Sequence, residues 1–118
     1  MARRIKRVVH VVHKRPGMPA EAVEIDGTLA AFQRLLDGGC LCAVKLTPGI
    51  HGYVDDEGLL KELPLNFVLR GEPIVGPVVF STLDAAGDDV GFSAEDALYF
   101  CKKINALGIG TPFFVEIR

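Results

Sequence analysis

The stretch Tyr53–Asn66 reads Tyr-Val-Asp-Asp-Glu-Gly-Leu-Leu-Lys-Glu-Leu-Pro-Leu-Asn, and neither helical nor strand periodicity explains it. Apolar, alternating segments flank it on both sides. Gly58 accepts backbone conformations that a residue with a Cβ atom resists, and Pro64 disfavours a helical conformation at Leu63. The stretch therefore predicts a shaped loop that leaves a β-sheet and returns to it.

Four leucines in this loop predict how it attaches to the rest of the protein. Leucines are found inside proteins more often than at their surface, so we expect these four to anchor the loop over the open end of the sheet. Asn66 is expected to hydrogen-bond the backbone of the turn. The leucines concerned are Leu59, Leu60, Leu63 and Leu65.

Short apolar segments separated by turn residues predict strands on both sides of the loop. Ile5–His13 and Ala20–Ile25 flank Pro16-Gly17, which suits a type II turn because proline fixes φ at its first central position and glycine accepts positive φ at the second. A second proline–glycine turn is predicted at Thr47-Pro48-Gly49. Further strands are predicted over Cys40–Leu46, Ile50–Val54, Phe67–Leu69, Ile74–Phe80 and Pro112–Arg118.

Two apolar stripes at helical spacing predict two helices. The first begins after Asp26 or Thr28 as the capping residue and ends at Gly38-Gly39, and the second begins after Ser93. Asp84–Asp89 is expected to be a surface loop before the second helix. The order of elements predicts one α+β domain over residues 1–118, with a mostly antiparallel sheet and two helices packed on one face.

The composition places the chain among compact globular proteins, because 49% of its residues are hydrophobic and 24% are charged. His10, His13 and Lys14 interrupt the apolar run near the N-terminus, so we expect no signal peptide. No segment approaches the roughly 18 apolar residues that a membrane-spanning helix needs. The odd number of cysteines favours reduced thiols, and these features together predict a cytoplasmic protein without a membrane partner.

A zinc site is conceivable from four residues, but their spacing argues against it. Cys40 and Cys42 would need Cys101 and His51 as further ligands, and no second close ligand pair with the usual zinc spacing occurs. We therefore expect neither a metal nor a cofactor.

The acids of the central stretch suggest a second, chemical interpretation of it. Asp55, Asp56 and Glu57 follow His51 closely and suit a hard divalent cation or general acid–base chemistry. Consecutive acids in a turn are usually solvated, however, and no phosphate-binding loop or nucleophile motif accompanies them, so the sequence disfavours an enzyme. The residues expected to meet a ligand or partner are His51, Tyr53, Asp55, Asp56, Lys61 and Asn66.

Charge is distributed unevenly along the chain. Residues 1–20 carry six Lys or Arg and no acid, whereas the whole chain has a net charge of −2. A basic first strand suits a phosphate backbone, although no aromatic residues lie between the basic ones to stack on bases, and a charged edge strand is the simpler interpretation. In the nucleic-acid hypothesis the contacts come from Arg3, Arg4, Lys6, Arg7, Lys14 and Arg15.

The segment Asp55–Asn66 carries a Gly-Leu-x-Lys-x-Leu-Pro-x-Asn motif, and Ile74-Val75-Gly76 and Gly87-Asp88-Asp89 follow it before the capped helix. In these features the chain resembles a domain-of-unknown-function family of small proteins encoded by bacteria, bacteriophages and plasmids. The resemblance is greatest over residues 50–100. It implies an intracellular accessory protein and supplies no catalytic residues.

Three functional hypotheses follow from the sequence. The leading one is a small, non-enzymatic binding or regulatory protein of phage or mobile-element type, whose partner is another protein that meets the basic first strand or the loop Tyr53–Asn66. The alternatives are a nucleic-acid-binding protein that uses the first strand, and a small enzyme or metal-ligand binder that uses the region of His51, Asp55 and Asp56.

Overall fold

The computed structural model describes residues 8–47, 49–84, 89–107 and 114–115 of the chain. The described residues omit the beginning of the predicted first strand, Pro48 of the second predicted turn, residues 85–88 of the predicted loop and most of the predicted last strand. In chain order the elements are β1 (Val8–Lys14), β2 (Glu21–Asp26), α1 (Leu29–Leu35), β3 (Leu41–Thr47), β4 (Ile50–Asp55), β5 (Leu65–Leu69), β6 (Glu72–Val75), β7 (Val78–Thr82), α2 (Ala94–Leu107) and β8 (Phe114–Val115).

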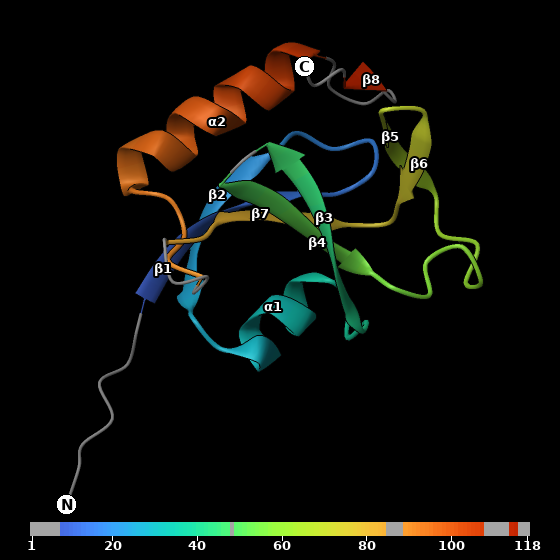
Figure 1. Ribbon diagram of the computed structural model, residues 1–118, viewed down its shortest axis with the longest axis horizontal. Helices are drawn as coiled ribbons and strands as arrows, with labels where there is room; N and C mark the ends of the chain where they lie inside the picture. Colours follow the sequence, from blue (N-terminus) through green and yellow to red (C-terminus); the bar gives the residue numbers. More distant parts are fainter. Residues whose placement is uncertain (1–7, 48, 85–88, 108–113, 116–118) are drawn as a thin grey trace, which may run out of the picture.

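Two sheets organise these strands (Figure 1). The larger sheet has the order β2-β1-β7-β4-β3, and each neighbouring pair in it is antiparallel. The smaller sheet has the order β6-β5-β8, in which β5 and β8 run parallel. The predicted α+β class with a mostly antiparallel sheet is confirmed.

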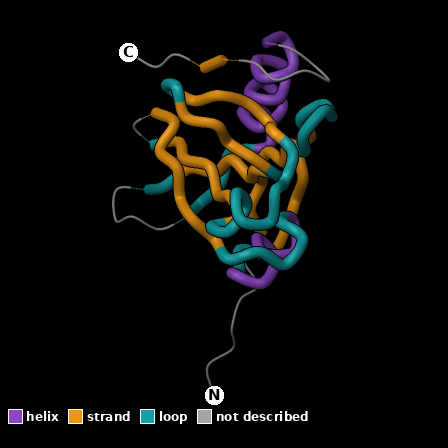
Figure 2. The backbone as a smooth tube through the Cα atoms, turned by 90° about the vertical axis from the view of Figure 1, so that its right-hand side faces the viewer, coloured by secondary structure: helices purple, strands orange, loops and turns teal. Residues whose placement is uncertain are grey.

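The two helices lie on opposite faces of the larger sheet rather than on one face (Figures 1 and 2). Val9 and Val11 of β1 pack in the cluster that contains Phe32 of α1, whereas Val12 packs in the cluster that contains Cys101 of α2. Successive side chains of a strand point to opposite faces, so these valines supply both cores. The stripe of each helix predicted that it would be buried, but it held no information on which face of the sheet would bury it.

The predicted strand Ile74–Phe80 is two strands in different sheets. Gly76 adopts a φ of +77° between β6 and β7, a conformation that favours glycine, and Pro77 follows it directly. The chain turns there from the smaller sheet into the larger one. Apolar residues on both sides of this turn continue the strand pattern, which is why the break was not predicted.

Local signals correctly predicted where both helices begin and where the first turn lies. The Thr28 hydroxyl accepts a hydrogen bond from the Ala31 amide at the start of α1, and the Ser93 hydroxyl accepts one from the Asp96 amide at the start of α2. Gly17 has a φ of +74° in the turn between β1 and β2. These features depend on residues close in sequence, so the sequence predicts them well.

The two faces of the larger sheet are covered unequally. One face packs against both the smaller sheet and α2, through a cluster that includes Phe67, Phe80 and Ile104. On the other face α1 has only seven residues and contacts β2 and β7. The Phe32 ring of α1 also packs edge to face on Tyr53 of β4, with the ring centroids 5.3 Å apart. Among these residues no helix is long and apolar enough to cross a membrane.

Candidate functional site

Strand β4 carries three of the predicted site residues at alternating positions. His51, Tyr53 and Asp55 therefore point to the same face of the sheet, the face on which α1 packs. Their partners come from different parts of the chain. Asp55 is bound into the loop that follows β4, whereas His51 and Tyr53 contact a residue that precedes α2.

The Asp55 carboxylate closes the base of the loop. One of its oxygens lies 2.6 Å from Lys61 Nζ, and the other accepts a hydrogen bond of 2.9 Å from the Glu57 amide. The Lys61 ammonium is the main reason why the pKa of Asp55 is lowered from its ordinary value. A Cβ atom at Gly39 would lie 2.5 Å from the Asp55 carboxyl carbon, so the carboxylate is also closely packed. This buried group is satisfied by its own loop.

Backbone hydrogen bonds hold the rest of this loop in one shape. Leu63 fits against Gly76, where an added Cβ atom would lie 2.6 Å from a Leu63 methyl group. Four hydrogen bonds of 3.0 to 3.1 Å join the amides of Gly58, Lys61, Glu62 and Leu63 to the carbonyls of Asp55, Glu57, Leu59 and Gly58, respectively.

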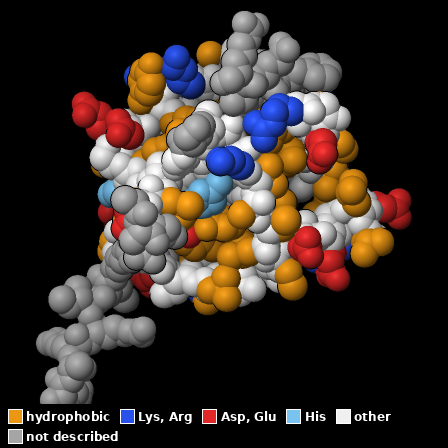
Figure 3. Space-filling view, in the orientation of Figure 1, with side chains coloured by type: hydrophobic (Ala, Val, Ile, Leu, Met, Phe, Trp, Pro, Cys, Tyr) orange, Lys and Arg blue, Asp and Glu red, His pale blue; other side chains and the backbone are white. Residues whose placement is uncertain are grey.

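The end of the loop exposes two leucines, contrary to the expectation that all four leucines anchor it. Leu59 and Leu60, which we call the dileucine tip, are 70% and 84% exposed, and Leu65 is also largely exposed. Leu63 is half-buried. Three exposed acids surround the tip in sequence, and in Figure 3 acidic side chains flank hydrophobic ones where the β4–β5 connection lies in Figure 1. They are Asp56, Glu57 and Glu62.

Asn66, at the far end of the loop, is fully buried and joins the two sheets. Its Nδ2 donates hydrogen bonds of 2.9 Å to the carbonyls of Lys14 and Gly76, and its Oδ1 accepts one of 3.2 Å from Lys14 Nζ. Burial lowers the pKa of Lys14, which also donates to the Arg15 carbonyl. The structure therefore places Asn66 in a buried polar network and away from solvent.

The basic first strand offers few available cations within the described residues. Lys14 is 1% exposed and engaged by Asn66, and Arg15 pairs with Asp37 at 3.3 Å. The other four residues of the nucleic-acid hypothesis, Arg3, Arg4, Lys6 and Arg7, lie outside the described part of the chain.

The opposite end of β4 opens onto a groove of about 380 Å³. We call it the β3–β4 groove, because residues of these two strands form most of its lining. Its floor and sides are mostly apolar, with a lysine at its border. The lining residues are Ala43, Lys45, Thr47, Gly49, Ile50, His51, Tyr53 and Leu83.

At the base of the groove, His51 and Tyr53 converge on Asp89. The Tyr53 hydroxyl donates a hydrogen bond of 2.5 Å to one Asp89 oxygen, and His51 Nε2 lies 3.3 Å from the other. The two rings pack edge to face, with their centroids 4.8 Å apart. Burial is the main reason why the pKa of Tyr53 lies far above its ordinary value, and the hydrogen bond to Asp89 raises this pKa further. The phenol is therefore neutral at physiological pH.

Ser81 brings a serine, a histidine and an aspartate into one region, but the arrangement does not suit nucleophilic catalysis. Ser81 pairs with His51 across β7 and β4 and is fully buried. Its hydroxyl makes no hydrogen bond to another described residue. A catalytic serine must be accessible to the substrate and must donate a hydrogen bond to its general base. Ser81 meets neither requirement.

The structure separates the residues of the predicted chemical site. Among the described residues, no three His, Cys, Asp or Glu side chains lie close enough to hold a metal ion. Cys101 is buried on the face that packs against α2, whereas His51 lies on the face that packs against α1. His51 and Asp55 have different partners, and neither is a partner of the other.

Sequence reasoning did not select Asp89, Ser81 or Lys45, and it assigned the dileucine tip to anchoring. Lys45 and Ser81 face His51 only through the pairing of β4 with β3 and β7. Asp89 lies 36 residues after Tyr53. The acidic loop before α2 was a visible signal for Asp89, but nothing local indicated that it would meet β4.

Comparison with known proteins gives a family and no activity. The model of a domain of unknown function, DUF3846, matches residues 8–105. The chain belongs to this family. The DUF3846 match spans both ends of β4, and therefore includes the loop with its dileucine tip and the β3–β4 groove. No curated protein and no solved structure matches the chain.

Proposed function

We propose that this protein is a small, non-enzymatic binding or regulatory protein of the cytoplasm, of phage or mobile-element type, and that a partner protein docks on the dileucine tip. The motif Gly58–Asn66, through which the sequence resembles families of such accessory proteins, supports the cellular setting. The single observation that carries the docking surface is the exposure of Leu59 and Leu60 on a loop that is otherwise closed by its own hydrogen bonds.

The shape of the loop supports binding without a large loss of conformational entropy. The Asp55–Lys61 ion pair and the four backbone hydrogen bonds hold the tip before a partner arrives. Binding energy is therefore not spent on ordering the loop, and this is the usual advantage of preorganisation. Two adjacent leucines on a fixed loop also offer apolar surface whose burial against a partner is favourable.

Charge indicates the chemistry of the partner surface. Asp56, Glu57 and Glu62 give the surroundings of the tip a negative charge. A complementary partner has an apolar pocket that takes the leucines and basic residues around that pocket. The same acids disfavour an anionic membrane surface as the target.

The absence of an assembled reaction centre among the described residues favours binding over catalysis. Ser81 is enclosed, and the His51 and Asp55 regions of the chemical hypothesis point to separate partners. Neither the enclosed Ser81 nor the separation of His51 from Asp55 hinders a partner from docking on the dileucine tip.

The experiment is capture of the partner from the native host, followed by titration of the identified, purified protein. The change is Leu59→Ser with Leu60→Ser, and the matched control is Leu98→Ser with Tyr99→Ser, which removes another adjacent and exposed apolar pair, from α2. We expect the tip variant to lose at least tenfold in affinity and the α2 variant to bind as the wild type does.

Two outcomes contradict the proposal. One is a partner that binds the tip variant with unchanged affinity. The other is a wild-type protein that associates with itself through these leucines in analytical ultracentrifugation, because a second copy then occupies the surface.

A further inference from the structure

The β3–β4 groove is a second surface with the properties of a ligand site, and it is independent of the dileucine tip. Its volume of about 380 Å³ lies within the range of roughly 300–1,000 Å³ found for small-molecule sites. Such sites are mostly apolar with a few polar groups at fixed places. Here the apolar part comes from Ala43, Ile50, Leu83 and the Tyr53 ring.

The polar groups of the groove are held in place before a ligand binds. Tyr53 and Asp89 are joined by their hydrogen bond, and His51 packs on the Tyr53 ring. His51 Nε2 is buried and forms no hydrogen bond with the described residues, although Asp89 lies 3.3 Å away. The base of the groove thus keeps one polar atom that is incompletely satisfied.

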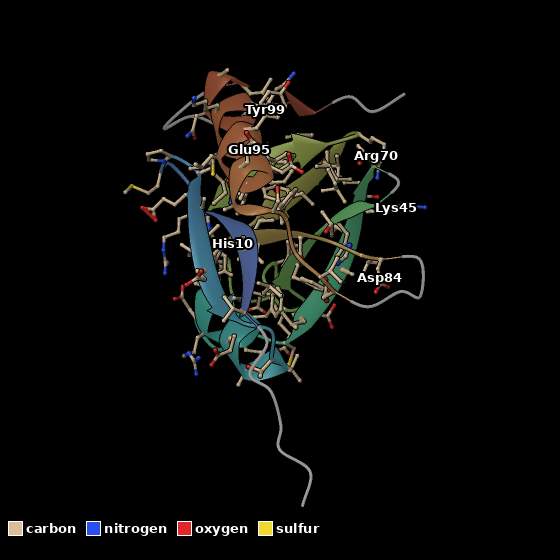
Figure 4. All side chains as sticks on the ribbon, turned by 90° about the vertical axis from the view of Figure 1, so that its left-hand side faces the viewer. His10, Lys45, Arg70, Asp84, Glu95 and Tyr99 are labelled. Carbon is tan, nitrogen blue, oxygen red and sulfur yellow. The ribbon has the colours of Figure 1, made fainter. Side chains whose placement is uncertain are left out.

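Lys45 gives the groove its accessible positive charge. It is exposed, lies across from His51 in the pairing of β3 with β4, and makes no ion pair with any described residue. Figure 4 shows Lys45 and Arg70 at the same edge of the molecule. The Arg70 guanidinium donates to the carbonyl of Lys45 at 2.7 Å and to that of Leu46 at 3.3 Å, which fixes a second cation next to the first.

These contacts also determine the direction from which a ligand approaches. β3 is an edge strand, and Arg70 donates hydrogen bonds to two of its carbonyls. An added peptide strand would compete with Arg70 for this edge. The described residues leave the groove open on the face of β3 and β4.

We propose that the β3–β4 groove binds a small organic anion, with its apolar body against Ile50 and the Tyr53 ring and its carboxylate or phosphate group at Lys45. A lysine ammonium is a compact charge that does not select strongly between carboxylate and phosphate. The shared feature of the ligand is therefore one anionic group on a flat or branched apolar body.

A matched series of probes tests the charge requirement. The series consists of 1-naphthoate, 1-naphthyl phosphate, the neutral 1-naphthalenemethanol and the cationic 1-naphthylmethylamine. Binding is followed through the backbone amide signals of the full chain in two-dimensional NMR. We expect both anions to shift the signals of Lys45, Ile50 and Tyr53, and the stronger of the two identifies the preferred anion. The alcohol is expected to bind more weakly and the amine most weakly.

The cationic probe serves a specific purpose. Asp84 and Asp89 lie on the same side of the molecule as the groove, and if their charge dominated, the amine would bind best. That result, equal binding of all four probes, or shifts confined to residues outside the groove would overturn the proposal.

Two variants distinguish the contribution of the Lys45 charge from that of the open volume of the groove. Lys45→Glu is expected to weaken the anions about fivefold at low salt, the upper range for one exposed ion pair, and less at high salt. Ala43→Gln fills part of the groove without changing its charge and should weaken all probes. Lys102→Glu on α2 is the control and should leave binding unchanged. Both Ala43 and Lys45 are exposed, so these variants should fold, and unchanged anion binding by Lys45→Glu would contradict the proposal.

Discussion

The two ends of β4 present alternating side chains to the same face of one sheet, but they lie in different surroundings. At the Asp55 end the loop folds back, satisfies the carboxylate with Lys61 and the Glu57 amide, and leaves Leu59 and Leu60 in solvent. At the His51 end the polar groups of the strand lie beneath a groove that the described residues leave open. The difference teaches that one strand can supply a structural ion pair at one end and the base of a groove at the other.

The largest expected effect concerns the buried end of the loop. We expect Asn66→Ala to lower the free energy of unfolding by about 3 to 5 kcal/mol, because two buried carbonyls lose their donor and the Lys14 ammonium loses one of its acceptors. Urea unfolding followed by circular dichroism measures the loss. The control is Asn105→Ala, which removes two hydrogen bonds to Ala20 at a partly buried position and should cost about 1 to 2 kcal/mol. Equal losses in the two variants would show that the buried network around Asn66 stabilises the fold no more than the partly buried hydrogen bonds of Asn105.

The next effect tests the close packing of Asp55. Gly39→Ala should cost about 2 to 3 kcal/mol, because the new Cβ atom displaces the Asp55 carboxylate from Lys61. Gly38→Ala is the control, since its φ is +86° but no atom lies within 4 Å of the added Cβ, and we expect about 1 kcal/mol. In a background of Asp55→Ala, the cost of Gly39→Ala should fall. A cost that stays the same there would mean that the clash lies elsewhere.

A smaller effect follows from the charge of Asp55. Asp55→Asn keeps an acceptor for the Glu57 amide but loses the ion pair, and we expect a loss of about 1 kcal/mol at neutral pH. The folded pKa of Asp55 is lowered, so its contribution is complete above the unfolded value near 3.8 and is lost as the pH falls through the folded pKa. The difference between wild type and variant in urea unfolding should therefore shrink below about pH 4. A difference that persists undiminished in acid would rule out the ion pair as its source.

The smallest loss is expected at the groove end. Tyr53→Phe removes the hydrogen bond to Asp89 and should cost about 1 kcal/mol, because Asp89 keeps its contact with His51. The raised pKa of Tyr53 means that stability falls as the pH rises above the unfolded value of 10.0, where only the unfolded phenol ionises. Ultraviolet titration of a Tyr99→Phe variant isolates the Tyr53 signal. Ionisation of Tyr53 in the folded protein near pH 10 would contradict the buried contact.

The sequence predicted the features that depend on neighbouring residues. The caps at Thr28 and Ser93, the turn at Gly17 and the strands on both sides of the central loop were found from local patterns. Features that depend on distant pairing were not predicted. Lys14 and Asn66 are 52 residues apart, and only the meeting of two sheets brings them together.

The leucines of the loop show why burial is difficult to predict inside an irregular segment. In a strand or helix the period of the apolar residues identifies the buried face, but a loop has no period. Leu59 and Leu63 have the same residue type and lie on the same short loop, yet only Leu63 packs against Gly76. The backbone path decides between them, and it depends on the Asp55–Lys61 pair and on the loop hydrogen bonds.

The free energy of unfolding of the Leu59→Ser, Leu60→Ser variant tests the central claim most directly. If the dileucine tip is a docking surface and not an anchor, stability in urea should stay within about 0.5 kcal/mol of the wild type, because exposed side chains contribute little to folding. A loss of about 4 kcal/mol or more, as expected for two leucines buried in a core, would contradict the account and restore the interpretation of these leucines as anchors of the loop.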